Sequence, residues 1–132
     1  MSKILYTTAT VLLLLFAIGH QLGFRKVDPS WHADQVVQAM QNVKMDVDGF
    51  QRTYWDFFSG FGFFVTALLL FSALTAWTLG HSSAGADLAL LRWSLAICYV
   101  VIAGLTWVNF FLVPGIFATA VALCLVAAAA LA

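Results

Sequence analysis

The chain has 132 residues, of which 63% are hydrophobic and only 9% are charged. A soluble domain carries about a quarter charged residues because its surface faces water, so this composition excludes an ordinary soluble protein and indicates a surface that faces lipid. The six basic and six acidic residues give a formal net charge of zero at pH 7. No excess positive charge is therefore available to attract nucleic acid.

Four apolar segments are each long enough to cross a hydrocarbon layer of about 30 Å. These spans run over residues 4–24, 54–79, 88–111 and 114–131. Small residues at 80–85 form a connection, and Pro114 suits the first turn of the last helix, where its missing N–H leaves no hydrogen bond unmade. We predict an all-α fold, in which residues 1–132 form a single transmembrane domain built as a four-helix bundle. Spans three and four should be a tightly connected antiparallel pair.

A polar segment of about residues 30–50 separates the first two spans. Asp28 and Pro29 signal a turn, and Ser30 suits the N-cap of a following helix. The apolar residues after it recur at helical spacing, at Val36, Val37, Met40, Val43, Val47 and Phe50. We predict a short amphipathic helix that lies on the membrane surface or caps the bundle. A partly ordered loop is the alternative.

The fourth span is rich in small residues, namely Gly115, Ala118, Thr119, Ala122 and Ala127 to Ala130. Apolar side chains gain little by leaving lipid tails, so helices in a bilayer are held together by close packing through small residues. We expect this span to be a packing element without chemistry. Cys98 and Cys124 lie in apolar runs without a CxxC pattern, and we expect both to be small buried residues.

Antiparallel connectivity brings the polar residues of several helix ends to one side of the membrane. These are His20 and Gln21 in span one, Tyr54, Trp55, Asp56 and Ser59 in span two, and Trp107 and Asn109 in span three. One face of span two runs from polar through small to apolar, along Asp56, Ser59, Gly60, Phe63 and Ala67. This gradient predicts a pocket that opens to the interface and is closed by hydrocarbon. Asp87 and Arg92, toward the opposite side, should be interfacial charges.

A carboxylate just inside a bilayer is costly, so Asp56 needs a partner, and His20, Arg52 and Asn109 are the candidates. One hypothesis makes Asp56 and His20 a catalytic acid–base pair, since a desolvated carboxyl group can hold a proton near neutral pH. The ligand-binding residues would then be Gln21, Tyr54, Trp55, Ser59, Gly60, Phe63, Trp107 and Asn109. The alternative is that Asp56 caps a helix or forms an ion pair, with Trp and Tyr in an ordinary aromatic belt.

No zinc-protease, phosphate-loop, hydrolase or dinucleotide motif occurs, so the sequence indicates no cofactor and no metal. The lipid bilayer is the expected surrounding of the protein, and two functions stay open. The first is binding of, or action on, a lipophilic small molecule such as a lipid or isoprenoid, with isomerisation, cyclisation or hydration as the fitting proton-transfer chemistry. The second is a non-enzymatic accessory or assembly subunit, in a homo- or hetero-oligomer, with the small residues of span four against a partner.

The segments AIGHQLG in span one and YWDFFSGFGFFVTALLLFSA in span two resemble a group of small, uncharacterised bacterial four-helix integral membrane proteins. The positions that carry the resemblance are His20, Trp55, Asp56, Gly60 and Gly62. The resemblance implies a four-span topology and a location in the bacterial inner membrane. It implies no activity that can be transferred.

Overall fold

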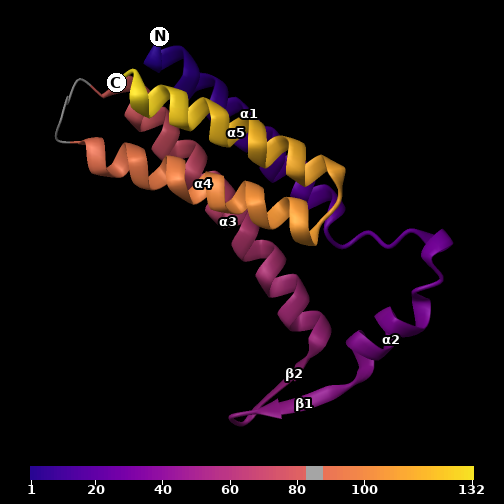
Figure 1. Cartoon of the computed structure of the whole chain (residues 1–132). Helices are drawn as coiled ribbons and strands as arrows, with labels where there is room; N and C mark the ends of the chain where they lie inside the picture. The colour runs from indigo at the N-terminus through magenta and orange to yellow at the C-terminus, as the bar shows by residue number, and fades with distance from the viewer. Residues whose placement is uncertain (83–87) are drawn as a thin grey trace. The chain divides into compact units, whose positions relative to one another are not determined.

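The structure is a computed structural model that describes residues 1–82 and 88–132. Over these residues, four helices are long and apolar enough to cross a membrane. They are α1 (Ser2–Gly23), α3 (Tyr54–His81), α4 (Ala89–Asn109) and α5 (Leu112–Ala130), as Figure 1 shows. Each begins and ends within two residues of a predicted span, which confirms the all-α fold with four spans. The chain has the helices of an integral membrane protein.

The predicted connection at residues 80–85 begins later than expected. Helix α3 continues through Gly80 to His81, so only Ser82 of the predicted connection is described outside a helix. The remainder of this connection, and the charge of Asp87, lie outside the described residues.

The chain divides into two compact units. The first, which we call the bundle unit, comprises Met1–Ala17 and Leu68–Ala132 and contains parts of all four long helices. The second, which we call the hairpin unit, comprises Ile18–Ala67. It contains the end of α1, the start of α3 and the polar segment between them.

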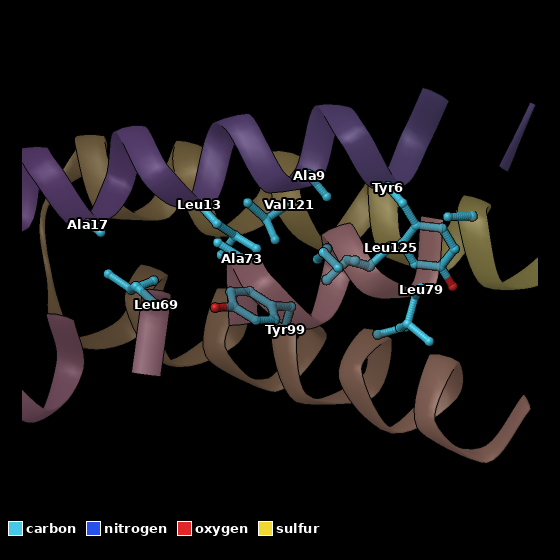
Figure 2. Packing of buried hydrophobic residues seen from close by; sticks show 14 residues of the cluster. Tyr6, Ala9, Leu13, Ala17, Leu69, Ala73, Leu79, Tyr99, Val121 and Leu125 are labelled. Carbon is cyan, nitrogen blue, oxygen red and sulfur yellow. The ribbon is translucent and has the colours of Figure 1, made fainter. Parts of the chain in front are cut away.

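Small and large side chains fit against one another in the core of the bundle unit, which Figure 2 shows from close by. Leu13 of α1 and Val121 and Leu125 of α5 are fully buried there, beside the small Ala9 and Ala73. An alanine at a helix contact lets two backbones approach closely, which is how helices associate in lipid. The same rule explains Gly80, where an added Cβ would lie 2.8 Å from the Cβ of Tyr6.

Helix α5 uses its small residues inside the bundle unit. Gly115, Ala118, Ala122 and Ala128 are all buried, as expected for a packing element. Only Phe110 and Phe111 separate α4 from α5, and the two helices lie side by side and antiparallel (Figure 1). Pro114 lies in the first turn of α5, as its missing N–H predicts.

The face of α4 that turns inward carries a charge. Arg92, Ala96, Tyr99 and Thr106 recur at helical spacing and are buried, so Arg92 is only 7% exposed. Arg92 therefore packs inside the bundle unit, and its depth in the membrane stays a prediction. The expectation of a buried Cys98 is wrong, because Cys98 is exposed and Cys124 is half-buried. The outer faces of these helices are apolar, as lipid-facing surfaces must be, so hydrophobicity alone does not predict which residues are inside.

The polar segment folds into three short elements, a 3-10 turn at Pro29–Trp31, the helix α2 (Asp34–Asn42) and a hairpin of β1 (Lys44–Val47) and β2 (Phe50–Thr53). Helix α2 confirms the short amphipathic helix. Its extension toward residue 50 is wrong, since Asp48 and Gly49 both have positive φ, 51° and 84°, and turn the chain into an antiparallel hairpin. Two left-handed residues, ideally Asp-Gly, match the twist of paired strands.

Side-chain hydrogen bonds hold the two turns of this segment. The Asp46 Oδ1 accepts a hydrogen bond from the Gly49 N–H at 2.8 Å and so fixes the hairpin turn. The Asp28 Oδ1 accepts one from the Ser30 N–H, also at 2.8 Å, and caps the 3-10 turn. Ser30 therefore does not cap α2, whose N-cap is Ala33 without a side-chain hydrogen bond.

Candidate functional site

The hairpin unit contains a polar cluster between the end of α1 and the first half of α3. We define this cluster as His20, Gln21 and Thr66, all of which are half-buried. The Thr66 hydroxyl donates to the Gln21 Oε1 at 3.0 Å and approaches its own helix at the Gly62 carbonyl, 3.2 Å away. The His20 Nδ1 lies 3.1 Å from the same hydroxyl oxygen. One hydroxyl thus joins two side chains of α1 to α3.

Counting protons assigns the roles in this cluster. A threonine hydroxyl has one proton, and both the Gln21 Oε1 and the Gly62 carbonyl are acceptors that can take it. When the proton goes to either of these acceptors, the Thr66 oxygen accepts from an N–H on the His20 Nδ1. A neutral imidazole carries only one N–H, so Nε2 has a lone pair. Among the residues that the structure describes, Nε2 has no hydrogen-bond partner.

The Phe24 ring lies beside this cluster and contacts other aromatic rings. The chain continues the last turn of α1 through a hydrogen bond from the Phe24 N–H to the His20 carbonyl, which brings the two rings into a stack at 5.0 Å and 7°. Phe58 and Phe63 of α3 lie 6.1 and 5.6 Å from the Phe24 ring, between centroids. The Arg25 guanidinium lies 5.2 Å from the centroids of both Phe24 and Phe63, a cation–π arrangement.

Gly62 makes room for the Phe24 ring. A Cβ built on Gly62 would lie 2.8 Å from the Phe24 Cζ and would overlap the ring edge. Gly62 is buried, whereas a Cβ on Gly60, two residues earlier, would meet nothing within 4 Å. The absence of a side chain at position 62 therefore lets α1 and α3 approach closely in the hairpin unit.

Asp56 makes the hydrogen bonds of a helix cap. Its Oδ2 accepts a hydrogen bond from the Thr53 N–H at 2.8 Å, and its own N–H donates to the Thr53 Oγ1 at 3.1 Å. Because α3 begins at Tyr54, these reciprocal bonds form a capping box, with Thr53 at the N-cap and Asp56 as the third helical residue. Asp56 is exposed in this unit.

His20 and Asp56 do not form a direct pair. Ten residues of α3 separate Asp56 from Thr66, the partner of His20, which is about 15 Å of helix at 1.5 Å per residue. Helix capping, the alternative derived from the sequence, describes the contacts of Asp56. A catalytic role for either residue stays a prediction.

The other predicted ligand residues of α3 lie at different positions along the helix. Phe63 lies at the cluster, against Phe24. Trp55 contacts Phe58 at 5.5 Å between ring centroids, and Tyr54 is exposed at the helix start. Gly60 faces open space, because a Cβ added to it would meet nothing within 4 Å. The Ser59 Oγ is buried without a hydrogen-bond partner among the described residues.

Trp107 and Asn109 belong to the bundle unit. The Trp107 Nε1 donates to the Thr119 Oγ1 at 2.9 Å and thereby joins α4 to α5. A Cβ on Gly115 would lie 3.0 Å from the Trp107 indole, so this glycine accommodates the ring. The Asn109 side chain donates to the Leu105 carbonyl of its own helix at 3.0 Å. Both residues therefore have structural contacts in this unit.

Thr66, Phe24 and Gly62 were not among the predicted site residues, although Gly62 is one of the positions that carry the resemblance. Thr66 follows Ser59 by seven residues and Phe63 by three, so it lies on the polar-to-apolar face that the sequence singled out. A threonine within an apolar span was the available signal, because its hydroxyl needs a partner in lipid. The pairing of Phe24 with Gly62 had no such signal, since it depends on how α1 and α3 meet.

Within the described parts of the chain, no three His, Cys, Asp or Glu side chains come close enough to hold a metal ion. No known protein family matches the sequence, and neither the curated proteins nor the solved structures contain a significant match.

Proposed function

We propose that this membrane protein binds a lipophilic small molecule whose polar group is held by the cluster of His20, Gln21 and Thr66. The observation that carries the proposal is the Thr66 hydroxyl, which fixes His20 and Gln21 through hydrogen bonds of 3.1 and 3.0 Å. Polar side chains are costly inside an apolar helix pair, and those that occur there commonly mark a site. This cluster leaves unused hydrogen-bonding capacity on both side chains, at the His20 Nε2 and the Gln21 amide NH2.

The surroundings of the cluster suit an apolar ligand. Phe24, Phe58 and Phe63 provide ring surfaces beside it, and Arg25 covers two of these rings at 5.2 Å. Binding sites for small molecules are mostly apolar, with a few polar groups that fix the orientation of the ligand. The cluster and the three rings have this composition.

Binding is favoured over catalysis by the position of Asp56. Proton transfer by an acid–base pair needs both groups within hydrogen-bond reach of the substrate. Asp56 is engaged with Thr53, about 15 Å along α3 from the level of His20. Isomerisation, cyclisation or hydration would therefore require a second acid or base other than Asp56.

An accessory or assembly role is the second hypothesis from the sequence. It expected the small residues of the fourth span to face a partner. Gly115, Ala118 and Ala122 are buried inside the bundle unit itself, so this face is already occupied by the chain's own helices. We therefore favour the ligand hypothesis. The resemblance of the segments around His20 and Trp55 to small bacterial membrane proteins supports a location in the bacterial inner membrane.

The proposal is tested by extracting what the protein carries from the membrane. Wild-type protein, Thr66→Val and Thr78→Val are purified in mild detergent, extracted into organic solvent and compared by mass spectrometry. Thr78 is the matched control, because the Leu74 carbonyl of the same helix, α3, is the only described partner of its hydroxyl. We expect a lipophilic species retained by wild type and Thr78→Val, and reduced roughly tenfold in Thr66→Val. Equal extracts from all three proteins would refute the site.

A further inference from the structure

We infer that the polar group of the ligand is a hydroxyl, which donates its proton to the His20 Nε2; this inference rests on the proposed function. The class of molecule is a long-chain or isoprenoid alcohol. The hydrogen bonds that already exist in the cluster determine which donor and acceptor atoms stay available to a ligand.

The hydrogen bonds of Thr66 determine which ring nitrogen of His20 carries the proton. The Thr66 hydroxyl has two acceptors for its one proton, the Gln21 Oε1 at 3.0 Å and the Gly62 carbonyl at 3.2 Å. When the proton goes to either of these acceptors, the Thr66 oxygen accepts from His20, which requires the N–H on Nδ1. Nε2, on the other side of the ring, is then an acceptor. A ligand that binds there must offer a donor.

The hydrogen bond of Gln21 to Thr66 determines which group of its amide a ligand can use. Its Oε1 is used by Thr66, which leaves the NH2 group, a donor with two hydrogens. No described residue accepts a hydrogen bond from it. His20 and Gln21 contact the same threonine oxygen, so the cluster offers one acceptor and one donor on neighbouring side chains. A hydroxyl is both donor and acceptor, so its hydrogen-bonding capacity matches both groups.

An oxygen-containing group without a proton to donate satisfies only one of the two. An ether or an aldehyde accepts from the Gln21 amide but has no proton for the His20 Nε2. An acceptor that a bound ligand covers but leaves without a donor costs free energy equivalent to roughly a tenfold or larger loss in affinity. The cluster should therefore discriminate between molecules that have the same apolar tail and differ in whether their polar group carries a proton to donate to the His20 Nε2. The aromatic rings of Phe24, Phe58 and Phe63 would contact the tail in each case.

The test compares three such molecules, farnesol, farnesyl methyl ether and farnesal, on the wild-type protein in lipid nanodiscs. We expect farnesol to bind roughly tenfold or more tightly than either of the other two. Comparable affinities for the three would overturn the hydroxyl inference while leaving the ligand site in place, because binding itself would be seen. Absence of binding by all three, together with equal extracts from wild type and Thr66→Val, would overturn both.

A second measurement does not need a ligand. Nitrogen NMR of histidine-labelled protein in lipid reports which ring nitrogen of His20 carries the proton, and His20→Asn identifies the signals by their loss. We expect an Nδ1–H and an unprotonated Nε2. The conservative variant Thr66→Ser should keep this pattern because it keeps the hydroxyl. A proton on Nε2 in the wild-type protein would overturn the inference whatever the protein binds.

Discussion

The Phe24 ring occupies the space that a side chain at position 62 would need. A Cβ on Gly62 would lie 2.8 Å from the Phe24 Cζ, so the two residues fit together only because one of them is glycine. Phe24 in turn stacks on His20 and lies against Phe63. The contact between Phe24 and Gly62 therefore supports the position of the polar cluster as well as the packing of α1 on α3.

Gly62→Ala should destabilise the hairpin unit, and Gly60→Ala should not. The added methyl group at position 62 forces the Phe24 ring to move, and overpacking of this kind costs about 1–3 kcal/mol. The same methyl at position 60 meets nothing within 4 Å and removes a helix-weakening glycine. Thermal unfolding in detergent should show a lower midpoint for Gly62→Ala alone. Equal midpoints for the two variants would contradict this packing.

Thr53→Ala should loosen the start of α3. It removes the hydroxyl that accepts from the Asp56 N–H, and loss of an N-cap costs about 1 kcal/mol. Amide hydrogen exchange should accelerate in the first turn of α3 and stay unchanged at the core positions of the bundle unit. Thr53→Ser keeps the hydroxyl and should exchange like wild type. Unchanged exchange in Thr53→Ala would mean that the capping box does not hold this turn.

Gly49→Ala should weaken the hairpin of β1 and β2. Gly49 has a φ of +84°, a conformation that costs a residue with a Cβ about 1–2 kcal/mol. We expect faster amide exchange at the strand residues 44–47 and 50–53. Gly23→Ala is the control, because an added Cβ there meets nothing within 4 Å and the glycine has no positive φ. Strand protection equal to wild type in Gly49→Ala would argue against the observed turn.

Gly80→Ala should destabilise the bundle unit, since its methyl group would lie 2.8 Å from the Cβ of Tyr6, a fully buried residue. Neither backbone can move without disturbing the packing of α1 on α3, and a cost of about 1–3 kcal/mol is expected. Gly104→Ala, which faces open space in α4, is the matched control. Chemical denaturation of both variants measures the difference, and a Gly80→Ala protein as stable as Gly104→Ala would refute the close approach.

The four helices could be predicted from the sequence because each span is a long apolar segment interrupted by turn residues. The hairpin was missed because the apolar positions between Val36 and Phe50 fit a helical period as well as a strand. Asp48-Gly49 was the signal that separates the two, since these residues adopt the left-handed conformations of a tight hairpin turn.

The candidate site was predicted in part. His20, Gln21 and Phe63 were chosen from their polarity and helical spacing, and the structure brings them to one place. Asp56 was assigned to the same site in one hypothesis because a carboxylate just inside a bilayer needs a partner. Helix capping was the alternative from the sequence, and threonine three residues before an aspartate is the pattern of a capping box. Thr66 could not be placed without knowing which face of α3 meets α1.

The ligand site is tested by the dissociation constant of farnesol for wild-type protein, Thr66→Val and Thr78→Val. Both substitutions replace a threonine of α3 by a residue of nearly the same shape, but only Thr66 joins His20 to Gln21. We predict a roughly tenfold weaker affinity for Thr66→Val and an unchanged affinity for Thr78→Val. The same affinity in all three folded proteins would contradict a ligand site at His20, Gln21 and Thr66.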